Sequence, residues 1–187
     1  MNPLRLPALL AIALLHTGCA VLDNVPPAAA FDVLGRVLAS GEGRAFSSNL
    51  RWRHDSDEDE IWLMSPVGQT LAHIAVNPSG ATLTAADQQV YRARSAESLT
   101  ESAFGWTLPL ARLRHWIRGD AVPGGANAVV RHDARGRIEQ IDQDGWAVRY
   151  AYADEPGAAQ HPRRLDVSRG DRRIRLVIDD WRDGVRP

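Results

Sequence analysis

The sequence predicts a mainly β protein with a helical insert, formed by one antiparallel meander of about eleven strands in a single domain, residues 31–187. Two observations support this fold class. Apolar residues recur at every second position in most short segments of this region, which is the spacing of strands with one buried face. Between residues 95 and 119 the spacing becomes helical. An antiparallel sheet this long tends to curl or close.

The first half of the domain contains the clearest strand pattern. Phe46, Ser48, Leu50 and Trp52 share one face of an alternating segment. We interpret the acidic run at residues 54–60 as a solvated hairpin turn that ends this strand. Strands are expected at residues 44–53, 61–64, 70–76, 81–85 and 89–92.

Two helices are expected next. Ser95 is a suitable N-cap for a helix through about Phe104. Pro109 suits the first position of a second helix, which Gly119 ends. Its apolar stripe consists of Leu110, Leu113 and Ile117, with Trp116 beside it. Strands return at residues 128–132, 137–142, 145–152, 161–168 and 172–180.

The inward faces of these strands are unusually bulky. The pattern alone leaves two outcomes open, a solid core or a sheet that wraps a lumen with the helices over its mouth. The candidates for lining such a cavity or its lid are Phe46, Leu50, Trp52, Ile74, Trp116, Trp146 and Tyr150.

The first 18 residues predict an export signal. Arg5 precedes a largely apolar run from Leu6 to Leu15, and this run is shorter than the roughly 20 residues needed to span a bilayer. Cys19 is the only cysteine of the chain and follows Thr17 and Gly18. The small residues before it resemble a bacterial lipobox, so Cys19 is the expected lipidated residue. Residues 19–30 are then a lipidated Cys and a Pro/Ala tether.

Composition excludes several function classes. A net charge of −1 argues against nucleic-acid binding. A single cysteine excludes an intramolecular disulfide framework and multi-Cys zinc sites. All 22 basic residues are arginine, which removes lysine-based catalysis. The run from Asp55 fails as a calcium loop, because Glu60 stands where glycine is needed and Pro66 where glutamate is needed. No metal, cofactor or catalytic residue is therefore predicted.

Several segments, in order along nearly the whole chain, resemble the LolB family of outer-membrane lipoproteins. They include the lipobox-like residues 17–19 and a Ser-Pro-Val-Gly turn at residues 65–68. The other segments are Leu34-Gly35-Arg36, Leu50-Arg51-Trp52, Leu108-Pro109-Leu110, residues 113–119, residues 145–150 and Asp180-Trp181.

The resemblance implies an open, unclosed antiparallel β-barrel of about eleven strands with an α-helical lid over a hydrophobic cavity. It also implies a monomeric receptor that accepts lipoproteins from the periplasmic carrier LolA and incorporates them into the outer membrane. The cavity would shield the acyl chains of the client lipoproteins, and an exposed apolar residue on a protruding loop, Val67 in this sequence, would deliver them to membrane lipid. Neither a cofactor nor an enzymatic activity is implied.

Two alternatives remain open at this stage. One is a lipid-tethered β-domain with a solid core that binds another envelope partner. The other is a periplasmic hydrolase whose serine, histidine and aspartate converge only in space. An apolar cavity under the helices argues against the first, and the absence of such a convergence argues against the second.

Overall fold

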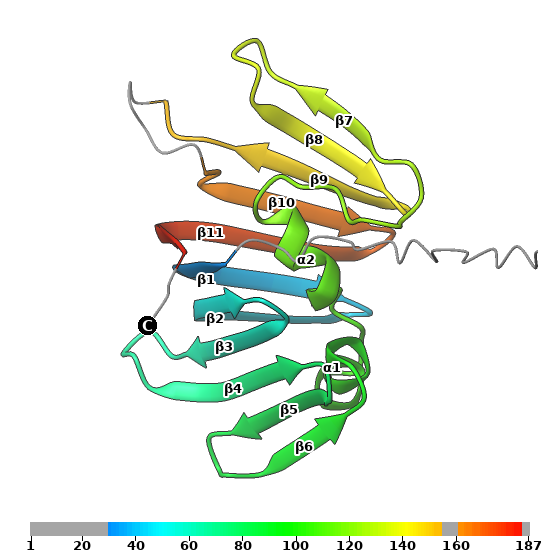
Figure 1. Cartoon of the computed structure of the whole chain (residues 1–187). Coiled ribbons are helices and arrows are strands. Elements are labelled where there is room, and N and C mark those ends of the chain that lie inside the picture. Colours follow the sequence, from blue (N-terminus) through cyan, green and yellow to red (C-terminus); the bar gives the residue numbers. More distant parts are fainter. Residues whose placement is uncertain (1–29, 155–160, 185–187) are drawn as a thin grey trace, which may run out of the picture.

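A computed structural model describes residues 30–154 and 161–184 of the chain. The expected signal, Cys19 and most of the tether lie outside these residues. Within the described ranges, eleven strands form one antiparallel sheet that does not close, which confirms the predicted fold class (Figure 1). The strands are β1 (Phe31–Gly41), β2 (Arg44–Asp55), β3 (Glu58–Met64), β4 (Thr70–Asn77), β5 (Gly80–Ala85), β6 (Val90–Ala93), β7 (Val129–His132), β8 (Ile138–Gln143), β9 (Trp146–Ala151), β10 (Arg164–Arg169) and β11 (Arg172–Asp183).

The strand order corrects the prediction of one continuous meander. The order is β6-β5-β4-β3-β2-β1-β11-β10-β9-β8-β7, so the first and last strands pair in the middle of the sheet. Two meanders therefore meet at β1 and β11, and the helical insert links the two outer edges. Local alternation could not reveal this arrangement, because pairing of β1 with β11 joins residues far apart in the sequence.

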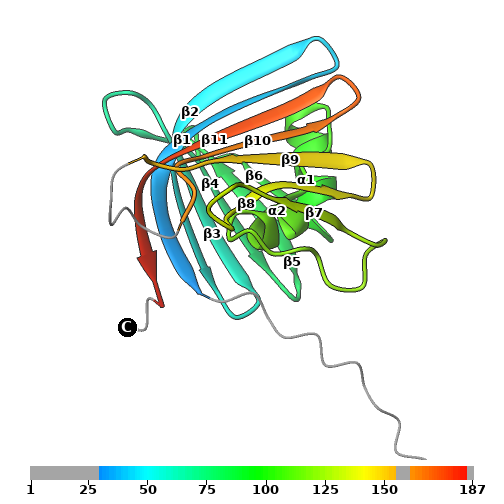
Figure 2. The ribbon, with the colours of Figure 1, turned by 90° about the horizontal axis from the view of Figure 1, so that it is seen from above.

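The sheet curves around the helices, as Figure 2 shows. Strand β1 is buried and exposed at alternate positions along most of its length, and β11 repeats this pattern with Ile174, Leu176 and Ile178 inward. Pairing shifts by one residue at Leu34 and Gly35, where β11 carries Asp179 as an extra residue. Such a bulge bends a strand and increases its twist.

The acidic run is largely strand and not a solvated turn, which makes that interpretation wrong. Only Ser56 and Asp57 lie between β2 and β3, and His54 pairs with Asp59 across the hairpin. The side chains of His54 and Asp59 are 0% and 3% exposed. Both continue the inward faces of their strands, because His54 lies two residues after Trp52 and Asp59 two residues before Ile61.

Two helices cover the concave face, close to their predicted positions. Helix α1 (Ala96–Phe104) begins at Ser95, whose hydroxyl accepts a hydrogen bond from the backbone N–H of Ser98, and ends at Gly105 in the left-handed conformation. Helix α2 (Leu110–Trp116) buries Leu110, Leu113 and Trp116. The backbone N–H of Leu108 donates to the buried Thr100 hydroxyl, which fixes the segment between the helices.

Candidate functional site

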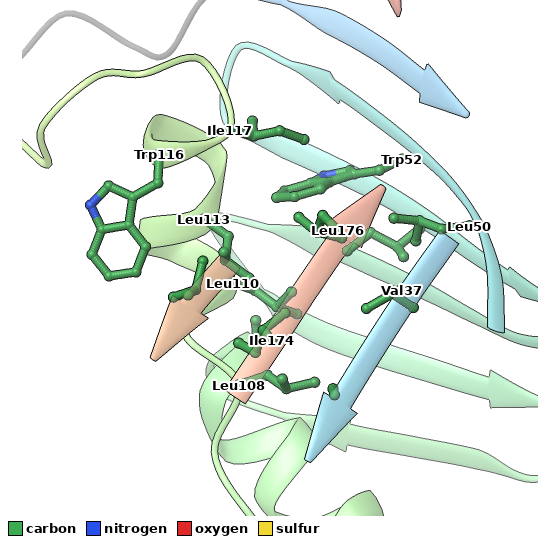
Figure 3. Packing of buried hydrophobic residues seen from close by; sticks show 14 of the residues in the cluster. Val37, Leu50, Trp52, Leu108, Leu110, Leu113, Trp116, Ile117, Ile174 and Leu176 are labelled. Carbon is green, nitrogen blue, oxygen red and sulfur yellow. The ribbon is translucent and has the colours of Figure 1, made fainter. Parts of the chain in front are cut away.

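A cavity with a wholly apolar lining lies between the sheet and the segment that carries α2. Leu108, Leu110 and Leu113 point from this segment toward the central strands, where Val37 and Ile174 face them (Figure 3). A cavity of about 40 Å³ remains between them. Its lining consists of Val37, Phe46, Leu50, Ile61, Leu63, Ile74, Leu108, Leu110, Leu113, Ile174 and Leu176.

The predicted cavity and lid residues lie in three places. Phe46, Leu50 and Ile74 line the cavity. Trp52, which is 2% exposed, lies beyond it and packs edge-to-face on Phe31, with ring centroids 5.2 Å apart.

Trp116, Trp146 and Tyr150 form a separate buried group on the other side of α2. The rings of Trp116 and Trp146 are 6.0 Å apart, and the Tyr150 hydroxyl donates to the carbonyl of Trp116 over 2.8 Å. Burial raises the pKa of Tyr150 well above its usual value, so this hydroxyl stays protonated as a donor. The group attaches α2 to β9 and does not line the cavity.

Three arginines tie the α2 segment to three parts of the sheet. Arg112 pairs with Asp144 in the turn between β8 and β9. Arg114 Nη2 lies 3.5 Å from Asp59 Oδ2 on β3, and Arg118 Nη1 lies 3.2 Å from Asp183 Oδ1 on β11. The hydrogen bond from Arg112 holds the pKa of Asp144 below its usual value, with help from the backbone N–H of Ala126.

A buried polar cluster forms around Asp59. Trp52 Nε1 donates to Asp59 Oδ1 over 2.8 Å, and His54 Nδ1 lies 2.9 Å from the same oxygen. Arg114 on α2 approaches the other carboxylate oxygen. His54 Nε2 and Arg114 Nε are buried and have no hydrogen-bond partner among the residues that the structure describes. Burial of a charge is costly unless it is paired, so the charges of Arg114 and Asp59 each offset the cost of burying the other.

Sequence reasoning missed this cluster and part of the cavity lining. The signal for His54 and Asp59 was present as period-two alternation that continues through the acidic run. The same alternation includes Ile61 and Leu63 on β3. No sequence signal pointed to Arg114, because its partner lies on a distant strand and reaches it only in the folded chain.

The turn between β3 and β4 presents Val67 to solvent. The backbone N–H of Gly68 donates to the carbonyl of Ser65 over 2.9 Å, and Gly68 has φ +84°. Pro66 occupies the second turn position, where proline is favoured, so Val67 lies at the tip. The side chain of Val67 is 82% exposed, and the turn projects away from α1 and α2 (Figure 2).

A larger hollow of about 550 Å³ lies at the outer side of α2, but its chemistry differs. Arg112, Arg169 and Arg172 border it together with Glu97 and Asp144. Trp146 and Val122 also line this hollow, so its wall mixes apolar and charged side chains. The small cavity has a wholly apolar lining and is the better candidate for an acyl chain. In the described ranges, no helix is long and apolar enough to cross a membrane, and no three His, Cys, Asp or Glu side chains gather as a metal site.

These features define a class of protein: an unclosed antiparallel sheet that curves around an apolar interior and carries a helical cover. A solved LolA superfamily protein from Nitrosomonas europaea shares this fold, with a TM-score of 0.51, 10% sequence identity, and coverage of 86% of this chain and 89% of that one.

The chain belongs to the LolB family, since the family model described as "Outer membrane lipoprotein LolB" matches residues 29–181. The outer-membrane lipoprotein LolB of Azoarcus sp. is 41% identical over 163 residues, which cover 87% of this chain and 82% of the relative. The protein of the same name from Nitrosomonas europaea is 39% identical over 153 residues, which cover 81% and 72%. The predicted family is therefore confirmed.

Proposed function

We propose that this protein is an outer-membrane lipoprotein that accepts other lipoproteins from the periplasmic carrier LolA and incorporates them into the outer membrane. The observation that carries the proposal is the apolar cavity beneath α2, in a chain of the LolB family. Apolar side chains shelter acyl chains without directional bonds. Transfer between two apolar hosts therefore needs no bond formation and no nucleotide.

Uptake of an acyl chain requires movement of the segment that carries α2, which we call the lid. A cavity of about 40 Å³ has room for only a few water molecules and is much smaller than a long acyl chain. Leu108, Leu110 and Leu113 fill the space above the central strands that an acyl chain would occupy. Displacement of the α2 segment exchanges these contacts for contacts with the acyl chain, so the net cost in apolar burial is small.

Release into the membrane is assigned to Val67 at the tip of the turn between β3 and β4. A valine that is 82% exposed gains by entering an apolar phase. The turn also lies on the side of the sheet opposite the helices, so it can reach lipid while the lid remains free to move (Figure 2).

Cys19 is the proposed anchor, although it lies outside the described residues. Acyl chains on this cysteine would hold the domain at the membrane, because each buried methylene contributes about 0.8 kcal/mol. Residues 20–30 would then act as a short tether between the lipid and β1.

The two alternative functions have less support than lipoprotein transfer. The interior is almost filled, so the small cavity alone does not separate a carrier from a solid-core binding domain, and membership of the LolB family is what favours the carrier. A buried His–Asp pair exists at His54 and Asp59, but within residues 30–154 and 161–184 no serine hydroxyl lies within hydrogen-bond distance of His54 Nε2. We therefore propose a role in lipoprotein transfer without catalysis.

The test is transfer of a labelled lipoprotein from LolA to outer-membrane vesicles. The wild-type chain should support transfer. A Val67→Glu variant should fold and accept the lipoprotein but fail to incorporate it, because a carboxylate resists entry into lipid. Val129→Glu is the matched control, since Val129 is also exposed, at 57%, but lies on β7. It should transfer normally.

Two results would contradict the proposal at different points. No transfer by the wild-type chain would remove the receptor function. Normal incorporation by Val67→Glu would remove the role of the turn while leaving the receptor function in place.

A further inference from the structure

The outer face of the central strands carries a group of guanidinium side chains. They project outward because their sequence neighbours, including Val37, Ile174 and Val148, point into the core. We call this group the arginine face, and it consists of Arg36 on β1, Arg149 on β9, Arg164 on β10, and Arg173 and Arg175 on β11.

Two aspartates balance only part of this charge. Asp166 pairs with both Arg164 and Arg175, at 3.0 and 2.5 Å, and Asp179 pairs with Arg36 at 2.9 Å. Arg149 has no carboxylate partner within the described ranges. In the described part of the chain, Arg173 donates to the carbonyls of Gly170 and Arg172 and to no carboxylate. The face is thus positive although the whole chain has a net charge of −1.

The arginine face is continuous with the turn that carries Val67. One groove, of about 260 Å³, is lined by Arg36, Leu38, Pro66 and Arg175 among others. A second, of about 480 Å³, begins at the same Leu38 and Arg175 and extends to Arg149 and Arg173. Leu38 is 46% exposed between these guanidinium groups. The two grooves therefore form one surface with both apolar and cationic side chains.

We propose that the arginine face docks on the phosphate headgroups of an anionic phospholipid bilayer. Guanidinium groups bind phosphate through paired hydrogen bonds. Within the described residues neither Arg149 nor Arg173 is paired with a carboxylate, so both can engage headgroups. Leu38 and Pro66 would rest at the boundary between headgroups and acyl chains, and the nearby Val67 would enter the apolar phase. Exposed apolar side chains among cations fit a bilayer surface better than an acidic protein, which offers no apolar layer beneath its charge.

This inference adds a lipid-binding surface to the proposed function. It rests on that function only for the role given to the Val67 turn, since headgroup binding is measured without any lipoprotein client. Each guanidinium group that approaches an anionic membrane strengthens binding about fivefold.

The experiment measures binding of the mature chain, residues 19–187, to sedimented vesicles of phosphatidylcholine, with and without phosphatidylglycerol. Every protein in it carries Cys19→Ser, so that neither the export signal nor an acyl group contributes. Binding should increase with phosphatidylglycerol and fall at high ionic strength. The double variant Arg149→Gln/Arg173→Gln should bind the anionic vesicles roughly thirtyfold more weakly than the protein that retains both arginines.

The matched control is Arg92→Gln/Arg94→Gln, which removes the same two charges at the β6 edge of the sheet. Its binding should stay within a fewfold of the protein with all arginines. Equal weakening of both double variants would show that only net charge matters and would overturn the proposal. So would the absence of any preference for phosphatidylglycerol.

A third result separates a protein partner from a membrane. If Arg149→Gln/Arg173→Gln binds vesicles normally but no longer supports lipoprotein transfer, the face docks an acidic protein and the membrane proposal is wrong. Failure of the proposed receptor function would instead leave the vesicle measurements unchanged, so the two proposals fail separately.

Discussion

Asp59 on β3 and Arg114 on α2 meet across the interior, with Oδ2 and Nη2 3.5 Å apart, and the Asp59 side chain is 3% exposed. The pair connects the lid to the sheet in a place that water hardly reaches. Trp52 and His54 contact the other oxygen of the same carboxylate. A single buried carboxylate on β3 therefore binds groups from β2 and α2.

We expect Asp59→Ala to destabilise the protein by about 3–5 kcal/mol, as is typical when one partner of a buried ion pair is removed. Arg114 and the Trp52 indole would be left without their acceptor. The free energy of unfolding in urea measures the effect. Arg36→Met is the control, because the Arg36–Asp179 pair is more than half exposed and should contribute about 0–1 kcal/mol. Equal losses in both variants would contradict the special role of Asp59.

We expect Leu113→Ala to reduce stability while it increases uptake of an apolar ligand. Leu113 is 3% exposed and lines the cavity, so its truncation should cost about 2–5 kcal/mol. The enlarged space should bind a fluorescent acyl probe more tightly than the wild-type interior does. Leu71→Ala, at a leucine that is 46% exposed, should change neither quantity. Unchanged probe binding by Leu113→Ala would argue that acyl chains enter elsewhere.

Gly35 should tolerate no side chain. A Cβ atom added there would lie 2.1 Å from the carbonyl oxygen of Val177, next to the bulge that joins β1 to β11. Backbone atoms cannot move aside cheaply, so Gly35→Ala should cost about 1–3 kcal/mol or more in unfolding experiments. At Gly41 the nearest atom would be in the flexible side chain of Arg172, at 3.1 Å, and the Trp106 ring would lie at an ordinary contact distance of 3.6 Å. Gly41→Ala should therefore be milder, and the reverse order would contradict this account.

Stability should fall in mildly acidic solution in part because of His115. Burial lowers the pKa of His115 below its usual value of 6.5, and the neighbouring Arg114 acts in the same direction. The unfolded chain therefore takes up a proton at a higher pH than the folded chain does. The stability that neutral His115 provides is complete above pH 6.5 and is lost as the pH falls toward the folded pKa.

Urea unfolding at several pH values tests this effect. His115→Gln should lose less stability between neutral and mildly acidic pH than the wild-type chain. His132→Gln serves as the control, because His132 is exposed on the edge strand β7 and should leave the pH dependence as it was. Identical pH profiles for wild type and His115→Gln would show that other groups control the acid sensitivity.

Much of the fold was predictable because its signals are local. Alternation identified the inward faces around Leu50, Ile74 and Ile174, and the Ser95 cap and the Leu110–Leu113 stripe identified both helices. The Pro66–Gly68 turn identified an exposed position at Val67. Ordered short segments along the chain were enough to indicate the LolB family.

By itself, the sequence determined most of the strand segments, both helices, many of the faces that turn inward, and the family, because each depends on residues close together in the chain. It gave no bounds for the strand at Phe31–Gly41 and misassigned the acidic run. Only the tertiary structure decided that β1 pairs with β11, that Trp116 and Trp146 sit apart from the cavity, and that Arg114 reaches Asp59. It also brought Leu38, Pro66 and the arginines of β9 and β11 onto one surface. These contacts join residues from distant segments, and local periodicity carries no information about which strands become neighbours.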